Sequence, residues 1–358
     1  MVREFDLVGK GVKLVLKDNV LAVVSDAELS TVSGAIYNGG FRKTRAILNI
    51  EVPDTYGDRR LHDDPIGFVR DSAKKLQLTD DFVSLVTAAK VRNFSLVRKQ
   101  RGAVAVSVVA TAGCSHAESA GEEIDAQHVV EGGTINVIVV IDGNPLESCL
   151  VAALATAVEA KASAMRDLDI RSRYTGEAAT GTITDSVAVA ATGAGEAVSL
   201  AGPASELGQL VAWCTRRAVR EAVTNQGECL PVRSVADRLR DRHLSVEKLA
   251  AELSKVKSFG LDEKALSKRL TEMLKGDAVF AGLVLAAVRM DEDAAAGLVP
   301  PEVGEVDEFG KALGALLGEQ SSVRKTELAR VRLPPVLRRV LVAKLEAGLC
   351  EAGRKRLK

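Results

Sequence analysis

The chain has 358 residues, of which 47% are hydrophobic and only 3% are aromatic, and its 48 basic residues balance its 48 acidic residues. This length and apolar content are enough for two ordinary cores, so we expect two domains. A formally neutral chain with few aromatic side chains lacks the basic field and the stacking platforms that favour nucleic acids or anionic membranes. We therefore expect small-molecule partners, no nucleic acid and no membrane, and leave homo-oligomer formation open.

The expected location is the cytoplasm. The N-terminal stretch is charged where a signal peptide has its apolar segment, and no apolar run approaches the roughly 20 residues that span a bilayer. The five cysteines are scattered without CxxC spacing, which argues against a disulfide framework and a zinc site. Reduced, mostly buried thiols are the expected state.

The first half of the chain contains several strand patterns. Two β-rich runs, 12–16 and 20–24, flank three polar residues and predict a hairpin. A third strand is expected at 46–52, where it ends at Pro53. Turn formers and charges then predict a loop, and the apolar spacing over residues 65–90 predicts a helix.

The next segments predict the centre of a sheet and its covering helices. The near-continuous apolar runs 104–110 and 135–141 are typical of strands buried on both faces, and 187–191 is a further buried strand. Helices are expected at 146–168 and at 203–225, the latter opened by Pro203. Together these elements predict a mixed α/β (α+β) N-terminal domain with a largely buried sheet.

From Val235 onward the strand signals disappear, and amphipathic segments alternate with glycine and proline breaks. An all-α C-terminal domain is the expected architecture of this part. The glycine and proline between two helical patterns at 229–234 predict the boundary. The expected domains are therefore residues 1–229 and 234–358.

Five separated stretches form one pattern, defined by their letters, order and spacing: Asn38-Gly39-Gly40, Thr111-Ala112-Gly113, TINVIV at 134–139, Glu159-Ala160-Lys161 and ATGTITDS at 179–186. This pattern resembles the adenosylcobinamide amidohydrolase family over roughly residues 20–225. The resemblance implies hydrolysis of the amide that joins aminopropanol to the corrin ring of adenosylcobinamide, giving adenosylcobyric acid. No cofactor is expected for this reaction.

Amide hydrolysis needs a nucleophile or an activated water, a proton donor for the leaving amine, and hydrogen-bond donors for the oxyanion. Among the motif residues, the catalytic candidates are Glu159, Lys161, Asp185 and Thr182, with Glu159 and Asp185 favoured as general bases. The substrate-binding candidates are Asn38, Gly39, Gly40, Thr111, Gly113, Asn136, Thr180 and Gly181.

Structural explanations stay open for these residues. The glycines can serve tight turns rather than an oxyanion. Glu159 and Lys161 lie on different sides of a helix, so one of them can be solvated. Cys114 and His116 follow the TAG motif, but a packed thiol is the simpler interpretation of Cys114. The chain has no HExxH helix, which favours a metal-free amidohydrolase.

The C-terminal stretches LTEMLKGDAV, AAVRMDEDAA and VDEFGKALGALLG resemble the phosphatidylglycerophosphatase A-like domain, a divalent-metal-dependent phosphatase. The resemblance implies Lys275 as a phosphate-binding residue and Asp277, Asp307 and Glu308 as ligands of Mg²⁺ or another divalent cation. It also makes Asp307 and Glu308 catalytic candidates. Solvated helix faces are the alternative explanation of these acidic residues.

The fused arrangement resembles archaeal bifunctional enzymes that also convert α-ribazole phosphate to α-ribazole. We therefore expect adenosylcobinamide and α-ribazole phosphate as substrates. The rival hypothesis is a corrinoid-binding or sensing protein without chemistry, whose C-terminal helices form an interaction or dimerisation module. The catalytic nucleophile, the metal and any communication between the two sites stay open. Gly310, Gly314 and Gly318 share a helix face and predict close helix packing.

Overall fold

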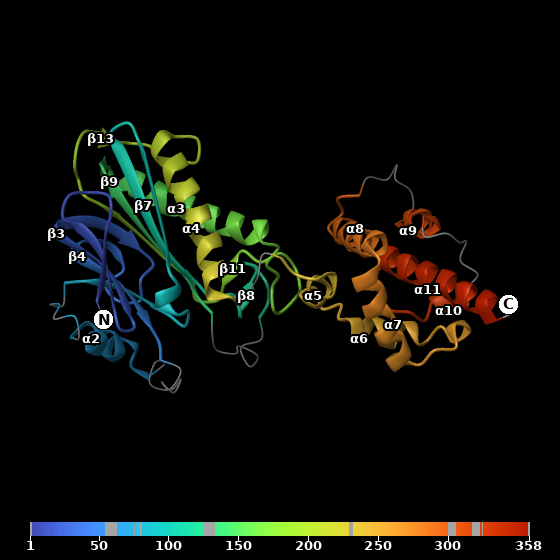
Figure 1. Ribbon diagram of the computed structural model, residues 1–358. Coiled ribbons are helices and arrows are strands. Elements are labelled where there is room, and N and C mark those ends of the chain that lie inside the picture. The colour runs from blue at the N-terminus through green and yellow to red at the C-terminus, as the bar shows by residue number, and fades with distance from the viewer. Residues whose placement is uncertain are drawn as a thin grey trace. The chain divides into compact units, whose positions relative to one another are not determined.

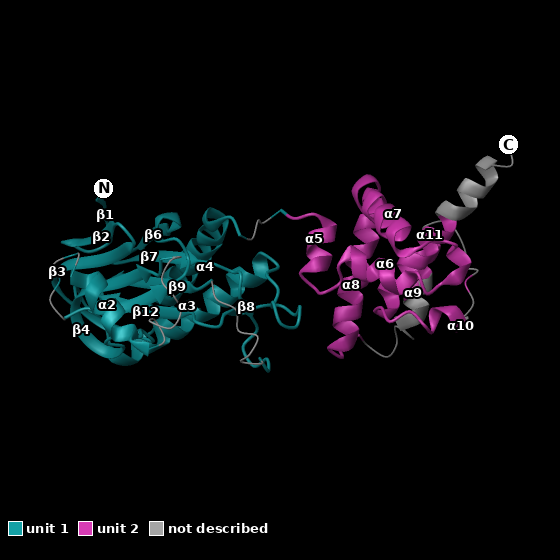
Figure 2. Cartoon of the chain, turned by 90° about the horizontal axis from the view of Figure 1, so that it is seen from below, with its two compact units in different colours: residues 1–232 teal, residues 233–358 magenta. Residues whose placement is uncertain are grey.

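The computed structural model describes residues 2–53, 63–74, 76, 78, 81–124, 133–228, 232–299, 306–316, 323 and 325–356. The chain divides into two compact units, residues 1–232 and 233–358 (Figure 2). This division falls inside the stretch where the sequence predicts a boundary, of which residues 229–231 lie outside the described part.

The first unit is built on a curled, mixed sheet (Figure 1). Its central path runs in the order β1-β2-β3-β12-β9-β7-β6, and β4 pairs with both β3 and β5. The strands are β1 (Arg3–Asp6), β2 (Val12–Lys17), β3 (Val20–Ser33), β4 (Gly40–Glu51), β5 (Val83–Thr87), β6 (Ser95–Arg101), β7 (Val104–Ala112), β9 (Ile135–Asp142) and β12 (Ser186–Ala191). Two short ribbons pair β8 (Ala117–Glu118) with β11 (Gly181–Thr182) and β10 (Asn144–Pro145) with β13 (Ala197–Val198).

Strand β3 makes the sheet curl. Its first residues pair with β2, whereas Ser30–Ser33 pair with β12 along the same edge. The pairing of β3 with β4 shifts register between Val24 and Leu29, and such a bulge bends a strand and increases its twist. The sheet therefore forms two facing leaves, one of β2–β5 and one of β7, β9 and β12, with a shared aliphatic core between them.

Strand β9 shows how the sequence specifies these layers. Its alternate residues Ile138 and Val140 face the core between the leaves, whereas Val137 and Val139 face helices. Those helices are α3 (Glu147–Asp167) and α4 (Glu206–Gln226), which pack on each other and on the sheet (Figure 1). Helix α3 is long and apolar enough to cross a membrane by composition, but half of its most apolar window is buried in this core. Helix α2 (Pro65–Lys74) covers the outer face of the other leaf.

Most predicted elements of the first unit are confirmed. The hairpin over 12–24, the strands β4, β7, β9 and β12, and the helices α3 and α4 lie where their patterns place them. The predicted helix over 65–90 is wrong in its second half, because α2 ends at Lys74 and Val83–Thr87 forms a strand parallel to β4. This run is rich in valine, which suits a buried strand, and its partner β4 is distant in sequence. Strands β1 and β6 and the 3₁₀ turn η1 (Val91–Asn93) were not predicted.

In the described part of residues 233–358 the regular elements are helices. They are α5 (Val235–Arg240), α6 (Val246–Leu253), η3 (Lys257–Phe259), α7 (Glu263–Gly276), α8 (Ala278–Ala295), α9 (Val306–Ala315), α10 (Lys325–Leu328) and α11 (Pro335–Arg356). They enclose a separate core of leucine and valine side chains. A Cβ at Gly310 would lie 3.2 Å from the Val336 Cα, and one at Gly314 would lie 3.1 Å from the Ala343 Cβ. The glycine spacing therefore does mark close packing of α9 on α11; Gly318 lies outside the described residues.

Candidate active site

Three motif stretches, 111–113, 134–139 and 179–186, meet at one end of the β7-β9-β12 leaf, where Lys161 joins them. Strand β9 runs antiparallel to β7 and parallel to β12, so the end of β7 meets the beginnings of the other two strands. Asn136 is the direct partner of Thr111 on one side and of Ser186 on the other. Residues far apart in sequence are thereby brought together, and strand ends are where binding residues commonly lie.

A buried ion pair lies at this strand end. The Lys161 ammonium on α3 donates to the Asp185 carboxylate just before β12, and the two side chains are 10% and 9% exposed. Asp185 also accepts from the backbone N–H groups of Ile135 (2.9 Å) and Thr182 (3.0 Å) and from the Thr182 hydroxyl. A carboxylate offers about four lone-pair sites, and Lys161 and these three donors occupy them. Asp185 is therefore well suited to hold Lys161 and poorly suited to accept a further proton.

Gly181 makes room for this pair. It lies on β11, and a Cβ at this position would collide with the Asp185 Oδ2 and the Lys161 Nζ. Gly181 was predicted to bind substrate, and the structure gives this position a steric role: only glycine leaves space for the ion pair. Nearby, the Thr180 hydroxyl accepts a hydrogen bond from the Ala120 N–H at 2.9 Å.

Strand β8 brings a second carboxylate to the pair. Strand β8 lies beside β11 (Figure 1), and Glu118 is the direct antiparallel partner of Gly181. Directly paired residues project to the same face of a ribbon, so the Glu118 side chain leaves it on the face of Gly181. Burial raises the pKa of Glu118, the Asp185 and Glu122 carboxylates raise it further, and the Lys161 ammonium opposes them. Burial also raises the pKa of Tyr174, whose hydroxyl has no hydrogen-bond partner among the residues that the structure describes.

A polar chain crosses the core between the two leaves. The Asn49 side chain on β4 donates to the Thr111 hydroxyl at 2.8 Å and accepts from the Asn136 amide at 2.8 Å. The Asn136 amide also donates to the Val86 carbonyl at 2.9 Å. Asn136 is 1% exposed, yet neither its Oδ1 nor the Ser186 hydroxyl has a hydrogen-bond partner within the described part of the chain. Unsatisfied buried oxygens at a strand end are available to a ligand or a bound water.

The loop after β7 differs from the expected oxyanion cradle. The Gly113 N–H donates to the Thr134 carbonyl at 3.1 Å, so it is already occupied. The next two N–H groups, of Cys114 and Ser115, donate to the Glu228 carboxylate at 3.0 and 3.2 Å. Cys114 and His116 are both buried, and burial, followed by the charge of Arg173, lowers the pKa of His116.

The Asn38-Gly39-Gly40 stretch forms the turn between β3 and β4. Asn38 and Gly40 have positive φ values of 54° and 82°, and a Cβ at Gly39 would collide with the Ala35 carbonyl. The Asn38 side chain donates to the Phe82 carbonyl at 2.9 Å, which ties the turn to the start of β5. The tight-turn explanation therefore accounts for all three residues.

Glu159 is not brought to the ion pair. It lies two positions before Lys161 on α3 and is exposed, whereas Lys161 is buried. Two helical steps rotate a side chain by about 200°, which sends Glu159 to the opposite face. Glu159 is therefore the solvated one of the two residues, and the general-base role expected for it gains no support from its position.

The described residues do not assemble the metal site expected in the second unit. The Asp277 carboxylate caps α8 by accepting from the Phe280 N–H at 2.9 Å, and it pairs with Lys344 at 2.6 Å. The Lys344 hydrogen bond is the main cause that lowers the pKa of Asp277. Lys275 is exposed in the last turn of α7. The side chains of Asp307 and Glu308 lie outside the described residues, and no group of three or more potential ligands occurs within them.

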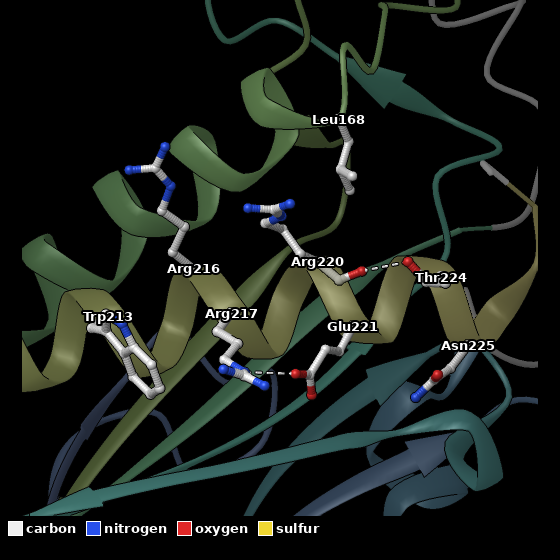
Figure 3. Close-up of a pocket in the computed structure, with 8 residues that line it drawn as sticks. All are labelled: Leu168, Trp213, Arg216, Arg217, Arg220, Glu221, Thr224 and Asn225. Atoms are coloured by element: carbon white, nitrogen blue, oxygen red, sulfur yellow. Dashed lines mark hydrogen bonds and ion pairs between the residues drawn. The ribbon is translucent and has the colours of Figure 1, made fainter. Parts of the chain in front are cut away.

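A groove of about 720 Å³ lies on the outer side of α4 (Figure 3). Arg216 pairs with Asp167, Arg217 pairs with Glu221 at 2.8 Å, and the Lys99 ammonium sits 4.0 Å from the centre of the Trp213 ring. The groove contains no predicted site residue, and its arginines already pair with Asp167 or Glu221. Its lining consists of Leu168, Trp213, Arg216, Arg217, Arg220, Glu221, Thr224 and Asn225.

Sequence reasoning missed four residues of this region: Glu118, Asn49, Ser186 and Glu228. Glu118 follows the TAG motif by only a few residues, but a two-residue strand carries no periodic signal. Asn49 is a polar residue inside an apolar strand pattern, which is a usable signal because a buried amide needs partners. Ser186 closes the ATGTITDS motif but was not among the candidate site residues.

Comparisons with known proteins found similarity over the N-terminal part of the chain. The family described as adenosylcobinamide amidohydrolase matches residues 8–231. An adenosylcobinamide amidohydrolase from Methanosarcina mazei is 29% identical over 194 residues, covering 54% of this chain and 82% of that protein. An uncharacterized protein from Methanocaldococcus jannaschii is 26% identical over 206 residues, covering 52% of this chain and 80% of that protein. Among solved structures, a Burkholderia sp. β-aminopeptidase matches at a TM-score of 0.32 and 12% identity, covering 63% of this chain and 87% of that chain.

Proposed function

The chain belongs to the adenosylcobinamide amidohydrolase family, and we propose from this that its first unit hydrolyses the aminopropanol amide of adenosylcobinamide to adenosylcobyric acid. The observation that carries the proposal is the convergence of the family's separated motifs at one strand end. Thr111, Asn136, Lys161, Gly181 and Asp185 come from four separate motif stretches and gather there.

The chemistry of the site suits an amide substrate. As water adds to the amide carbon, negative charge develops on the carbonyl oxygen. A positive group stabilises this charge most effectively when the group is already held in place and does not have to reorganise. The Lys161 ammonium is held by Asp185 in a water-poor position and meets this requirement. The buried Asn136 Oδ1 and Ser186 hydroxyl, which have no hydrogen-bond partner among the described residues, belong to the same strand end.

The test is incubation of the purified full chain with adenosylcobinamide in ¹⁸O-water. We expect one ¹⁸O atom in the carboxylate of adenosylcobyric acid and an equal amount of aminopropanol, both quantified by mass spectrometry. Tight binding of adenosylcobinamide without product would instead support the corrinoid-binding or sensing hypothesis.

For the second unit, we propose an all-α domain that converts α-ribazole phosphate to α-ribazole with Mg²⁺ or another divalent cation. Its support is the sequence resemblance around Lys275, Asp277, Asp307 and Glu308. Phosphate release from α-ribazole phosphate that stops on addition of EDTA is the expected result. Equal activity with and without EDTA would overturn the metal requirement. If no phosphate is released, the phosphatase proposal is wrong and the interaction-module hypothesis is favoured. A cytoplasmic location and small-molecule substrates complete the proposal.

A further inference from the structure

Glu118 lies outside every motif that predicted the site, but strand pairing places it beside the ion pair. It is the direct partner of Gly181 in the β8-β11 ribbon. The direction in which Gly181 would carry a side chain is filled by the Asp185 carboxylate and the Lys161 ammonium. Directly paired residues project to the same face of a ribbon, so the Glu118 carboxyl faces this pair.

Four ionisable groups surround the Glu118 carboxyl: Asp185 before β12, Lys161 on α3, Glu122 in the loop after β8, and Tyr174. The two carboxylates and partial burial favour the protonated form, and Lys161 favours the ionised form. A carboxylate whose pKa is raised is a stronger base at neutral pH than an ordinary glutamate. Glu118 is also partly exposed, so water and substrate can reach it.

The carboxylates of Glu118, Glu122 and Asp185 differ in how many hydrogen bonds their oxygens accept. Asp185 accepts from four donors. Glu122 accepts from the hydroxyls of Ser172 and Thr175. Among the described residues, no hydrogen bond reaches the Glu118 carboxylate. Of the three, Glu118 is the one whose oxygens can exchange a proton without breaking a structural contact.

We propose that Glu118 is the catalytic general base and general acid of the amide hydrolysis, acting beside the fixed ammonium of Lys161. This inference rests on the proposed function of the first unit. Glu118 removes a proton from water while the water oxygen bonds to the amide carbon, and Lys161 faces the charge on the carbonyl oxygen. The same proton then passes from Glu118 to the amide nitrogen as the carbon–nitrogen bond breaks. Water is thereby divided between a carboxylic acid and an amine, and Glu118 returns to its ionised form.

The experiment compares Glu118→Gln with the wild-type full chain. The variant should lose kcat by about 100-fold or more and keep its Kd for adenosylcobinamide within roughly twofold, because a glutamine keeps the shape but cannot act as a general acid or base. The wild-type kcat should fall at low pH, where Glu118 takes up a proton, and this limb should be absent from the residual activity of Glu118→Gln. Glu118→Asp keeps a carboxylate and should recover part of the rate.

The matched control is Glu123→Gln, which makes the same change on an exposed side chain in the loop after β8 and should keep the wild-type kcat. A Glu118→Gln enzyme that binds adenosylcobinamide and turns it over within threefold of wild type would overturn the inference and leave the proposed function standing. A wild-type chain that releases no aminopropanol would overturn the proposed function itself, and the inference with it.

Discussion

The Lys161 ammonium and the Asp185 carboxylate form an ion pair in which both side chains are about nine-tenths buried. Lys161 comes from the middle of a core helix and Asp185 from the residue before a core strand, so the pair joins the helical layer to the sheet. Two charges in such a place are costly to desolvate, and they persist because each compensates the other. Removing one partner alone should therefore destabilise the first unit more than removing both.

Replacing Lys161 by methionine should destabilise the first unit by about 3–5 kcal/mol, because Asp185 would remain buried without its counter-charge. Trp213, the sole tryptophan of the chain, lies on α4 and reports the unfolding of this unit by fluorescence in urea. The double variant Lys161→Met with Asp185→Leu should recover much of this loss while staying inactive. A loss below about 1 kcal/mol in the single variant would show that the pair contributes little net free energy.

Gly181→Ala should lower kcat by about 100-fold, because the new methyl group would push the Lys161 ammonium away from Asp185 and displacements near 1 Å are enough for such losses. The matched control is Gly202→Ala, where a Cβ has nothing within 4 Å. Steady-state hydrolysis of adenosylcobinamide by both variants is the measurement. Equal kcat values for the two would contradict the steric role of Gly181.

Asp291 should make the second unit less stable as the pH rises. Burial raises the pKa of this carboxyl from 3.8, even though it accepts hydrogen bonds from the N–H groups of Val336 and Leu337 at 2.9 Å. The folded state therefore binds the proton more tightly than the unfolded state. The contribution of this group is largest below the ordinary pKa and declines as the pH rises through the raised one.

This pH dependence is measurable in the full chain as hydrogen exchange of the first amides of α11 between about pH 3 and pH 7. Asp291→Asn should abolish the part of the slope due to this carboxyl and cost about 1–3 kcal/mol, because its amide NH₂ would face a backbone donor. The control Asp293→Asn changes a side chain that pairs with Arg289 on the helix surface and should keep the slope. An unchanged slope in Asp291→Asn would contradict the assignment.

The thiols of Cys149 and Cys214 should resist iodoacetamide at pH 8 in the folded chain. Both are fully buried, and burial raises the pKa of Cys214 to about 12 and also raises that of Cys149. Alkylation requires the thiolate, which is then scarce as well as inaccessible. Mass spectrometry of peptides from native and urea-unfolded protein gives the comparison. Modification of Cys214 at the same rate in both samples would contradict this expectation.

The sequence predicts the parts of this fold that are long and periodic. The apolar runs of β7 and β9 and the helical spacing of α3 and α4 identify the central leaf and its cover, because their burial repeats over many residues. The segment of β5 was assigned to a helix, since its few apolar residues fit either period and its partner β4 lies more than 30 residues away. A two-residue strand such as β8 is too short to show a periodic pattern of apolar residues, so the sequence did not identify Glu118 as a site residue.

The candidate site was predictable to the extent that motifs mark strand ends. The stretches at 111–113, 134–139 and 179–186 do converge, and Lys161 joins them. The choice between Glu159 and Lys161 depends on which side of α3 faces the sheet, and a largely apolar helix leaves that orientation undecided in the sequence. The occupancy of Asp185 by four donors likewise depends on loops whose geometry no local pattern specifies.

The bulged strand β3 has a mechanical consequence for the first unit. One continuous strand borders β2 in its first half and β12 in its second, and β4 follows it along both halves. The two leaves are therefore a single covalent and hydrogen-bonded shell, without a hinge about which they could part. Opening the space between them would break a strand in the middle, so a substrate as bulky as a corrin has to approach from outside, over the ends of β7, β9 and β12. A shell of this kind holds its reactive groups rigidly at the strand ends. Selectivity between substrates then depends on the loops around those strand ends.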